Sequence, residues 1–169
     1  MTNLFDMCQK IRNNKLSFVL NPDSIWDSFN KKFEGTVNCI WQEVKFLDDT
    51  SKELHSSMNS LPSNCGGIYV FVLKTDIIPN THLYTLYIGR AKITEKQNLK
   101  RRCKQYLNDT RPKILYMRET WGKNLYIRYL PLMDNNIIDE LEEELIKVVI
   151  PPCNDRYPDV INLAMKAAF

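Results

Sequence analysis

The first third of the chain spaces its apolar residues as helices do. Two segments, 2–12 and 22–33, place them three and four positions apart, which predicts a short helix in each. The polar run Asp48–Ser51 can cap a third helix continuing to about Ser60, and a turn follows at 61–64. We therefore expect residues 1–61 to form a mainly helical N-terminal extension.

After Gly67 the pattern becomes that of strands. Residues 68–73 and 83–88 are dense in β-branched and aromatic side chains, and the polar loop between them predicts an antiparallel hairpin. A helix is predicted over 98–107, a third strand over 124–131, and a helix over 136–150 that stops at two prolines. A final helix is predicted over 158–168. The order β-β-α-β-α predicts an α+β domain.

Strand alternation sorts the residues of 68–73 onto two faces. Tyr69 shares a face with Phe71 and Leu73, and Tyr87 lies on the partner strand. Cross-strand neighbours are close enough for two phenols to share one cleft if the register allows it. The alternative is that these aromatic residues only pack in the sheet.

Composition removes several classes of chemistry. A chain of 169 residues predicts one compact domain. Its five cysteines form no C-x-x-C pair, its two histidines form no H-E-x-x-H motif, and its five glycines form no phosphate-binding loop. We therefore expect no disulfide framework, zinc site or nucleotide cofactor, and acid–base chemistry would use Tyr, Lys, Glu or Asp. With no signal peptide or membrane span visible, we expect a cytoplasmic protein without a membrane partner.

Two predicted helices place a charged residue on an apolar face. Arg102 falls on the seam of Leu99, Cys103 and Tyr106, where it needs an anion unless its head group reaches back to water. Glu142 falls on the apolar stripe of the 136–150 helix. A carboxylate there is costly unless it binds a cation, and Mg²⁺ suits one carboxylate completed by water and phosphate oxygens. An inaccurate helical wheel is the alternative for Glu142.

The net charge of +3 conceals a strong segregation. Residues 90–118 carry ten basic and two acidic side chains, whereas residues 134–144 carry six acidic side chains and no basic one. A basic stretch interleaved with Tyr106 and Tyr116 beside a lone carboxylate fits phosphodiester binding with metal-assisted hydrolysis. A lysine-rich surface that serves only solubility is the alternative.

Five short motifs in order resemble those of the GIY-YIG nuclease superfamily. Gly67-Ile68-Tyr69 and Tyr87-Ile88-Gly89 resemble the two motifs that name it, and residues 89–92 and 98–102 resemble its G-K-A-x and N-L-x-x-R segments. Residues 142–154 resemble its E-x-x-L-I-K-x-x-x-P-x-x-N block. The resemblance covers about residues 62–154. It departs from the family in two longer loops and in Tyr106, where many members have histidine and the excision-repair branch has tyrosine.

The resemblance implies a small three-stranded antiparallel sheet flanked by helices and a nuclease that uses one Mg²⁺ or Mn²⁺ ion per active site. It implies that Tyr69, assisted by Tyr87, takes a proton from the attacking water, that Arg102 binds the scissile phosphate and that Glu142 holds the metal. Supporting roles fall on Gly89, Tyr106 and Asn154. The basic side chains expected to contact DNA are Arg90, Lys92, Lys100, Arg101 and Lys104.

These observations predict a metal-dependent DNA endonuclease, with residues 1–61 as an extension for DNA contact, dimerisation or buttressing. Residues 62–154 form the predicted nuclease core, and residues 155–169 a C-terminal helix on it. Free-standing members of the family of about this size are often restriction or phage-defence enzymes, so the resemblance implies a bacterial restriction-like or phage-defence enzyme acting on double-stranded DNA. A homodimer would address both strands. The alternatives are a strand-nicking repair or recombination nuclease and a non-catalytic DNA-binding module.

Overall fold

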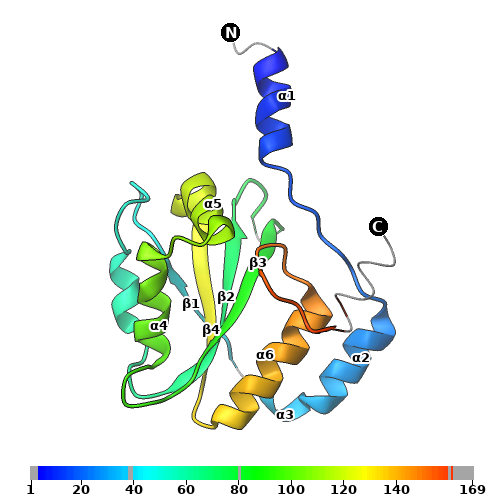
Figure 1. Ribbon diagram of the computed structural model, residues 1–169, viewed down its shortest axis with the longest axis vertical. Coiled ribbons are helices and arrows are strands. Elements are labelled where there is room, and N and C mark those ends of the chain that lie inside the picture. Colours follow the sequence, from blue (N-terminus) through cyan, green and yellow to red (C-terminus); the bar gives the residue numbers. More distant parts are fainter. Residues whose placement is uncertain (1–3, 38–39, 80, 160, 162–169) are drawn as a thin grey trace.

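The computed structural model describes residues 4–37, 40–79, 81–159 and 161, and its centre is a four-stranded antiparallel sheet (Figure 1). The strands lie in the spatial order β1-β4-β2-β3. Their bounds are Gln42–Lys45 (β1), Gly66–Lys74 (β2), Leu83–Ala91 (β3) and Leu125–Leu132 (β4).

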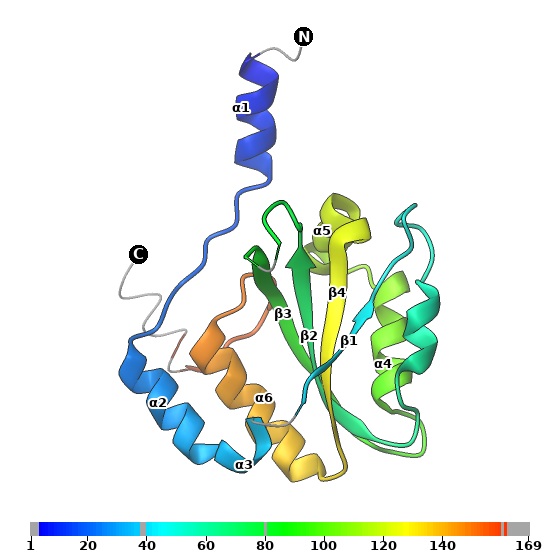
Figure 2. The ribbon, with the colours of Figure 1, turned by 180° about the vertical axis from the view of Figure 1, so that it is seen from behind.

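Helices cover both faces of this sheet (Figures 1 and 2). One face carries α4, α5 and the 3-10 turns η1 and η2, and the other carries α6 with α2 packed outside it. The helical bounds are Leu4–Asn13 (α1), Asp23–Lys32 (α2), Glu34–Val37 (α3), Leu99–Gln105 (α4), Pro112–Trp121 (α5) and Asn135–Val149 (α6); the 3-10 turns are Ser56–Ser60 (η1), Tyr106–Asn108 (η2) and Gly122–Asn124 (η3). Because both faces are covered, β2 is apolar along almost its whole length.

The predicted alternation of β2 is confirmed. Tyr69, Phe71 and Leu73 enter the core beneath α4 and α5, whereas Ile68 and Val70 enter the core beneath α6. Two hydrophobic layers therefore meet on a single strand.

A β-bulge lies in β3, opposite the step from Phe71 to Val72 of β2. Across the ladder Tyr87 pairs with Phe71, but Thr85 pairs with Val72, so Leu86 is the extra residue. Both Leu86 and Tyr87 consequently face the α4 core. Tyr87 shares the face of Tyr69 because it lies two residues before Gly89, the ladder partner of Tyr69, and the bulge adds Leu86 to that face.

Two expectations about the sheet and its N-terminal neighbour are wrong. The sheet has four strands rather than three, because β1 from the N-terminal extension pairs with β4 along the edge. Asp48 does not cap a helix: its carboxylate accepts the backbone N–H of Lys52 within a tight loop, which is closed by a bridge between Leu47 and Leu54. The only helical structure between that loop and β2 is the 3-10 turn η1, whose first turn is capped by His55.

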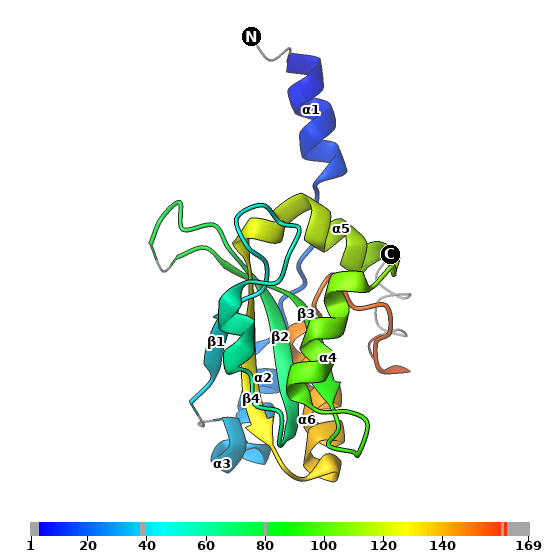
Figure 3. The same cartoon turned by 90° about the vertical axis from the view of Figure 1, so that its left-hand side faces the viewer.

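The other boundaries differ less. The predicted 98–107 helix is α4 continued by η2, and α5 is an additional helix that the pattern did not predict. The helix predicted over 158–168 lies largely outside the described residues. Residues 75–79 and 81–82, between β2 and β3, project beyond the sheet, and α1 extends away from the core (Figure 3). No helix among the described residues is long and apolar enough to cross a membrane.

Candidate active site

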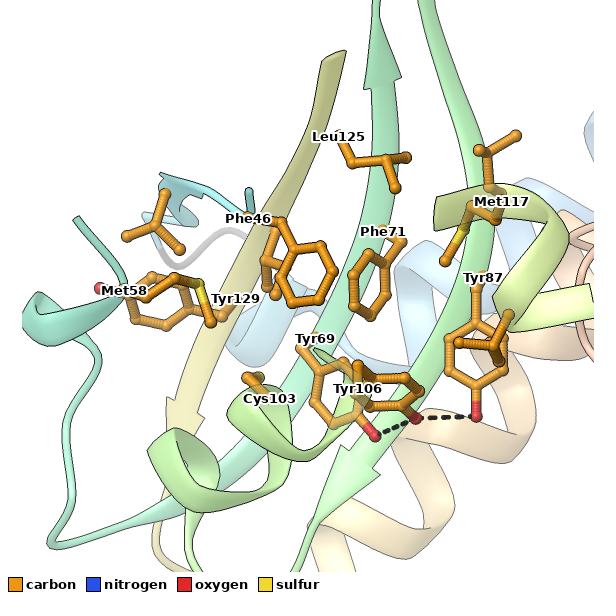
Figure 4. Packing of buried hydrophobic residues seen from close by; sticks show 14 of the residues in the cluster. Phe46, Met58, Tyr69, Phe71, Tyr87, Cys103, Tyr106, Met117, Leu125 and Tyr129 are labelled. Carbon is orange, nitrogen blue, oxygen red and sulfur yellow. Dashed lines mark hydrogen bonds between the residues drawn. The ribbon is translucent and has the colours of Figure 1, made fainter. Parts of the chain in front are cut away.

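Three tyrosine hydroxyl groups form a chain on the α4 side of the sheet (Figure 4). The hydroxyl of Tyr106 lies 2.8 Å from that of Tyr69 and donates a hydrogen bond of 3.1 Å to that of Tyr87. Their rings pack edge to face around Phe71, and all three are buried. The predicted sharing of one site by Tyr69 and Tyr87 therefore occurs through Tyr106.

Gly89 gives the Tyr69 ring its position. The two residues are partners across the β2–β3 ladder, and a Cβ at Gly89 would lie 2.6 Å from the Tyr69 hydroxyl oxygen and 2.7 Å from its Cζ. The ring can cross the neighbouring strand only because glycine leaves that space open.

Arg102 approaches this chain from α4. Asn98 caps the helix by accepting the backbone N–H of Arg101, and Leu99 and Cys103 bury its inner face. Arg102 lies at the edge of that face, half-buried, and its Nε donates to the Tyr69 hydroxyl at 3.2 Å. Burial acts to lower the pKa of Arg102, but its contacts with Tyr69 and Tyr106 raise it above the usual value. The guanidinium is therefore a permanent positive charge at this hydroxyl.

Burial has the opposite consequence for the phenols. Loss of solvation raises the pKa of Tyr69 well above its ordinary value, and Tyr106 and Tyr87 add to that rise, although Arg102 opposes it. The pKa of Tyr106 is raised as well, again chiefly by burial. Tyr69 is thus a neutral phenol at neutral pH, not a preformed phenolate.

Glu142 enters the site from α6. Its side chain is only 16% exposed, and it forms an ion pair with Arg90 of β3. Arg90 also forms an ion pair with Asp139, one turn earlier in α6, and Lys92 forms a second ion pair with Asp139. Burial raises the pKa of Glu142, and Arg90 offsets part of that rise. The predicted carboxylate on the apolar stripe is therefore present, with a cation beside it.

Asn154 fastens the segment after α6 to β3. Its side-chain oxygen accepts the backbone N–H of Ile88 and its amide donates to the Ile88 carbonyl, both at 2.9 Å. The Cys153 backbone N–H donates to the Leu86 carbonyl beside it. Residues 153–154 thus extend the edge of β3 and close one wall of the site.

These groups line one cavity of about 880 Å³. The sequence-predicted residues that line it are Tyr69, Tyr87, Arg90, Lys92, Arg102, Glu142 and Asn154. Tyr106 lies behind them in the hydroxyl chain, and Gly89 lies opposite Tyr69 on β3.

Three predicted DNA contacts lie elsewhere. Lys100, Arg101 and Lys104 line a separate hollow on α4, and both lysines donate to Asn59 of η1. Conversely, Arg111 and Arg156 line the main cavity without having been singled out from the sequence. Their signals were available: Arg111 belongs to the basic stretch, and Arg156 follows Asn154 by two positions.

The residues present fit a hard divalent cation. Among the described residues no group of three or more His, Cys, Asp or Glu side chains is placed to hold a metal ion. Glu142 offers a single poorly solvated carboxylate that opens into a cavity large enough for water and a phosphate group. One carboxylate, water and phosphate oxygens form a ligand set that Mg²⁺ accepts.

No family model matches the chain, and no curated protein matches it either.

The chain is similar to solved structures of GIY-YIG endonuclease domains. Two of them are of the N-terminal endonuclease domain of UvrC from Thermotoga maritima. An asparagine-to-alanine variant bound to its catalytic divalent cation is 24% identical, with a TM-score of 0.44, over 61% of this chain and 100% of that one. The domain bound to magnesium is 24% identical, with a TM-score of 0.43, over 60% of this chain and 99% of that one.

Proposed function

We propose that this chain is a divalent-metal-dependent DNA endonuclease that hydrolyses a phosphodiester bond in the main cavity. One observation carries the proposal: Tyr69, Arg102 and Glu142, which come from a strand and two helices far apart in the sequence, line the same cavity. A phenol, a fixed guanidinium and a poorly solvated carboxylate are the groups that proton transfer, phosphate binding and metal binding require. The GIY-YIG resemblance of the sequence supports the same chemistry.

Arg102 has the role of binding the scissile phosphate. Its positive charge is fixed, its helix is capped and packed, and its Nε is already oriented by the Tyr69 hydroxyl. The charge-assisted hydrogen bonds of a guanidinium strengthen as a phosphate gains negative charge in the transition state.

Tyr69 accepts the proton of the attacking water. Because the pKa of Tyr69 is raised, its phenol is neutral before the reaction. Tyr69 therefore accepts the proton of the water only as it donates its own proton to Tyr106. Tyr106 in turn donates to Tyr87, which loses its proton to water in the cavity. One proton enters the chain at Tyr69 and one leaves at Tyr87, and each phenol stays neutral overall.

Glu142 is the residue that would hold one Mg²⁺ or Mn²⁺ ion. Such an ion supplies Lewis-acid polarisation of the phosphate and stabilises the leaving oxygen. Arg90, which now neutralises Glu142, retains Asp139 as a second partner when Glu142 is occupied.

A plasmid digest tests the proposal. Purified protein with Mg²⁺ is expected to cleave plasmid DNA, with no cleavage in EDTA, and Glu142→Ala is expected to abolish cleavage while DNA binding in a gel shift persists. Glu140→Ala is the matched control, because Glu140 is an exposed carboxylate on the same helix that pairs with Lys32 outside the cavity. Undiminished cleavage by Glu142→Ala would contradict the metal assignment, and binding without cleavage by the unaltered protein would favour the non-catalytic module.

The finer role that we propose is a restriction-like or phage-defence enzyme acting on double-stranded DNA, with strand-nicking repair or recombination as the alternative. The cavity chemistry supports both roles equally, so the digest distinguishes them. Discrete fragments support a sequence-specific enzyme, and nicked circles support the one-strand alternative. A homodimer, which would address both strands, is tested by the mass of the protein and of its DNA complex in solution.

A further inference from the structure

Arg111 is a second arginine at the hydroxyl chain. Its guanidinium carbon lies 5.5 Å from the ring centre of Tyr106 and 5.7 Å from that of Tyr87, whereas the carbon of Arg102 lies 5.2 Å from the Tyr106 ring centre. Both arginines line the main cavity. Because both carbons lie within 5.5 Å of one ring centre, at most twice that distance separates them.

Asp109 holds the Arg111 side chain in a fixed direction. Nε of Arg111 donates to both carboxylate oxygens at 3.1 Å and Nη2 donates to one of them at 2.7 Å, while the same carboxylate also accepts the backbone N–H of Arg111. This pairing raises the pKa of Arg111 and lowers that of Asp109. The guanidinium is therefore charged and oriented before any ligand arrives.

The loop that carries this pair is tied down independently. Arg118 of α5 reaches back and donates to the backbone carbonyls of Tyr106, Leu107 and Asp109. Arg118 therefore holds this loop in addition to the Asp109–Arg111 pair. Because the loop has this second anchor, a purely structural role does not fully explain why Arg111 lies in the cavity.

One end of the Arg111 guanidinium has no carboxylate within hydrogen-bond distance. Asp109 occupies Nε and Nη2, and Nη1 lies 4.0 Å from Asp155, beyond that distance, while the guanidinium also contacts the Tyr87 and Tyr106 phenols. The side chain is 37% exposed, and the charges of Lys113 and the exposed Arg156 outweigh that of Asp155, which lies 4.0 Å from Lys113 as well. An anion entering the cavity meets an oriented donor there.

We propose that Arg111 binds a second backbone phosphate of the substrate strand, next to the phosphate that Arg102 binds. This inference rests on the proposed nuclease function and names a subsite of it. Successive phosphates of one strand of duplex DNA rise about 3.4 Å along the helix axis, and the upper limit on the separation of the two guanidinium carbons exceeds that rise, so both arginines can contact neighbouring phosphates. Asp109 and Arg111 then act together as a positioning pair that sets the register of the strand over Glu142.

The salt dependence of DNA binding tests the subsite. Anisotropy of a labelled duplex oligonucleotide in EDTA gives the binding constant without cleavage. The slope of log K against log salt concentration is negative, and each lost phosphate contact reduces its magnitude by about 0.9. We expect that decrease in Arg111→Gln and also in the double variant Asp109→Asn/Arg111→Gln, which removes both charges of the pair. In Mg²⁺ both variants should raise KM for DNA more than they lower kcat.

The matched control is the pair Glu43→Gln/Arg128→Gln. Arg128 is also paired with a local carboxylate and is 42% exposed, but it lies on β4 outside the cavity, so its slope and KM should equal those of the unaltered protein. An unchanged slope in both Arg111 variants overturns the subsite. So does a loss in Arg111→Gln that the double variant restores, because that result assigns the effect to an uncovered Asp109 carboxylate. Failure of the unaltered protein to bind or cleave DNA would instead overturn the proposed function itself.

Discussion

The Tyr69 ring crosses the backbone of Gly89 so closely that a single methyl group at Gly89 would overlap the phenol, at 2.6 Å from its oxygen. The two residues are paired across the β2–β3 ladder, so neither can move without disturbing the sheet. The position of the hydroxyl that we assign to proton transfer therefore depends on a glycine of the neighbouring strand.

Gly89→Ala is expected to displace the Tyr69 hydroxyl and to lower cleavage sharply. Overpacking of this kind costs about 1–3 kcal/mol, which urea unfolding measures. Gly35→Ala in α3 is the control, since a Cβ there meets nothing within 4 Å and both stability and cleavage should be retained. Full activity of Gly89→Ala would show that the phenol position is not critical.

Tyr69→Phe tests the hydroxyl itself. The ring stays and the Arg102 and Tyr106 hydrogen bonds are lost, so we expect cleavage to fall about 10²–10⁴-fold while stability changes by only about 1 kcal/mol. Tyr129→Phe is the matched control. Tyr129 is the ladder partner of Tyr69 on β4, is also a buried residue, and donates a hydrogen bond from its hydroxyl to Gln42 away from the cavity. Equal loss of cleavage in both variants would mean that the effect is structural.

The sequence predicts the central part of this site well because its residues belong to strongly patterned elements. Period-two alternation places Tyr69 on its face, and the helical seam places Arg102 toward the core edge. Tyr87 reaches the same face because it lies two residues before Gly89, the ladder partner of Tyr69. The bulge opposite Phe71 and Val72 is not visible in the pattern, and it adds Leu86 to that face.

Two features escaped prediction for physical reasons. The edge strand β1 is four residues long and has polar neighbours on both sides of its one buried residue, Val44, so it reads like a loop. Arg111 looks like any other member of a basic stretch because its placement depends on Asp109 and on the packing of α5. Both positions are decided by tertiary contacts.

The strand β1 is joined to its neighbours by an ion-pair network centred on Glu43. Its carboxylate pairs with Lys74 of β2 and with Arg128 of β4. Burial acts to raise the pKa of Glu43, but these two partners more than offset it, so the pKa is lowered below its ordinary value. A depressed pKa stabilises the folded state above the unfolded pKa, and that contribution is lost as the pH falls through the folded value.

Glu43→Gln is therefore expected to lower the free energy of unfolding at pH 7 by about 1 kcal/mol, a value kept small by solvent screening. The difference from the unaltered protein should shrink as the pH falls below about 4.5. Chemical unfolding at a series of pH values measures both. Glu53→Gln, in the exposed loop after β1, should change stability by less than about 0.5 kcal/mol. A difference for Glu43→Gln that is constant from pH 7 to pH 3 would contradict the network.

Two asparagines clamp β3 and its continuation in the same manner, and comparing them separates stability from function. Asn154 exchanges two hydrogen bonds with the backbone of Ile88, and Asn135 exchanges two with the backbone of Ile93 at 2.9 and 3.1 Å. Asn154 is 4% exposed and lines the cavity, whereas Asn135 is half-buried and lies outside it.

Asn154→Ala leaves a buried N–H and a buried carbonyl of Ile88 without their partner, at a cost of about 2–4 kcal/mol. It also releases the segment that carries Arg156 and closes the cavity wall, so cleavage should fall even at a temperature where the variant is fully folded. Asn135→Ala should cost less, because water can replace the lost hydrogen bonds at a half-buried site, and it should cleave normally. Thermal unfolding followed by cleavage assays well below each midpoint measures the two effects separately. If both variants lose cleavage only in proportion to their unfolded fraction, Asn154 stabilises the fold and has no part in shaping the site.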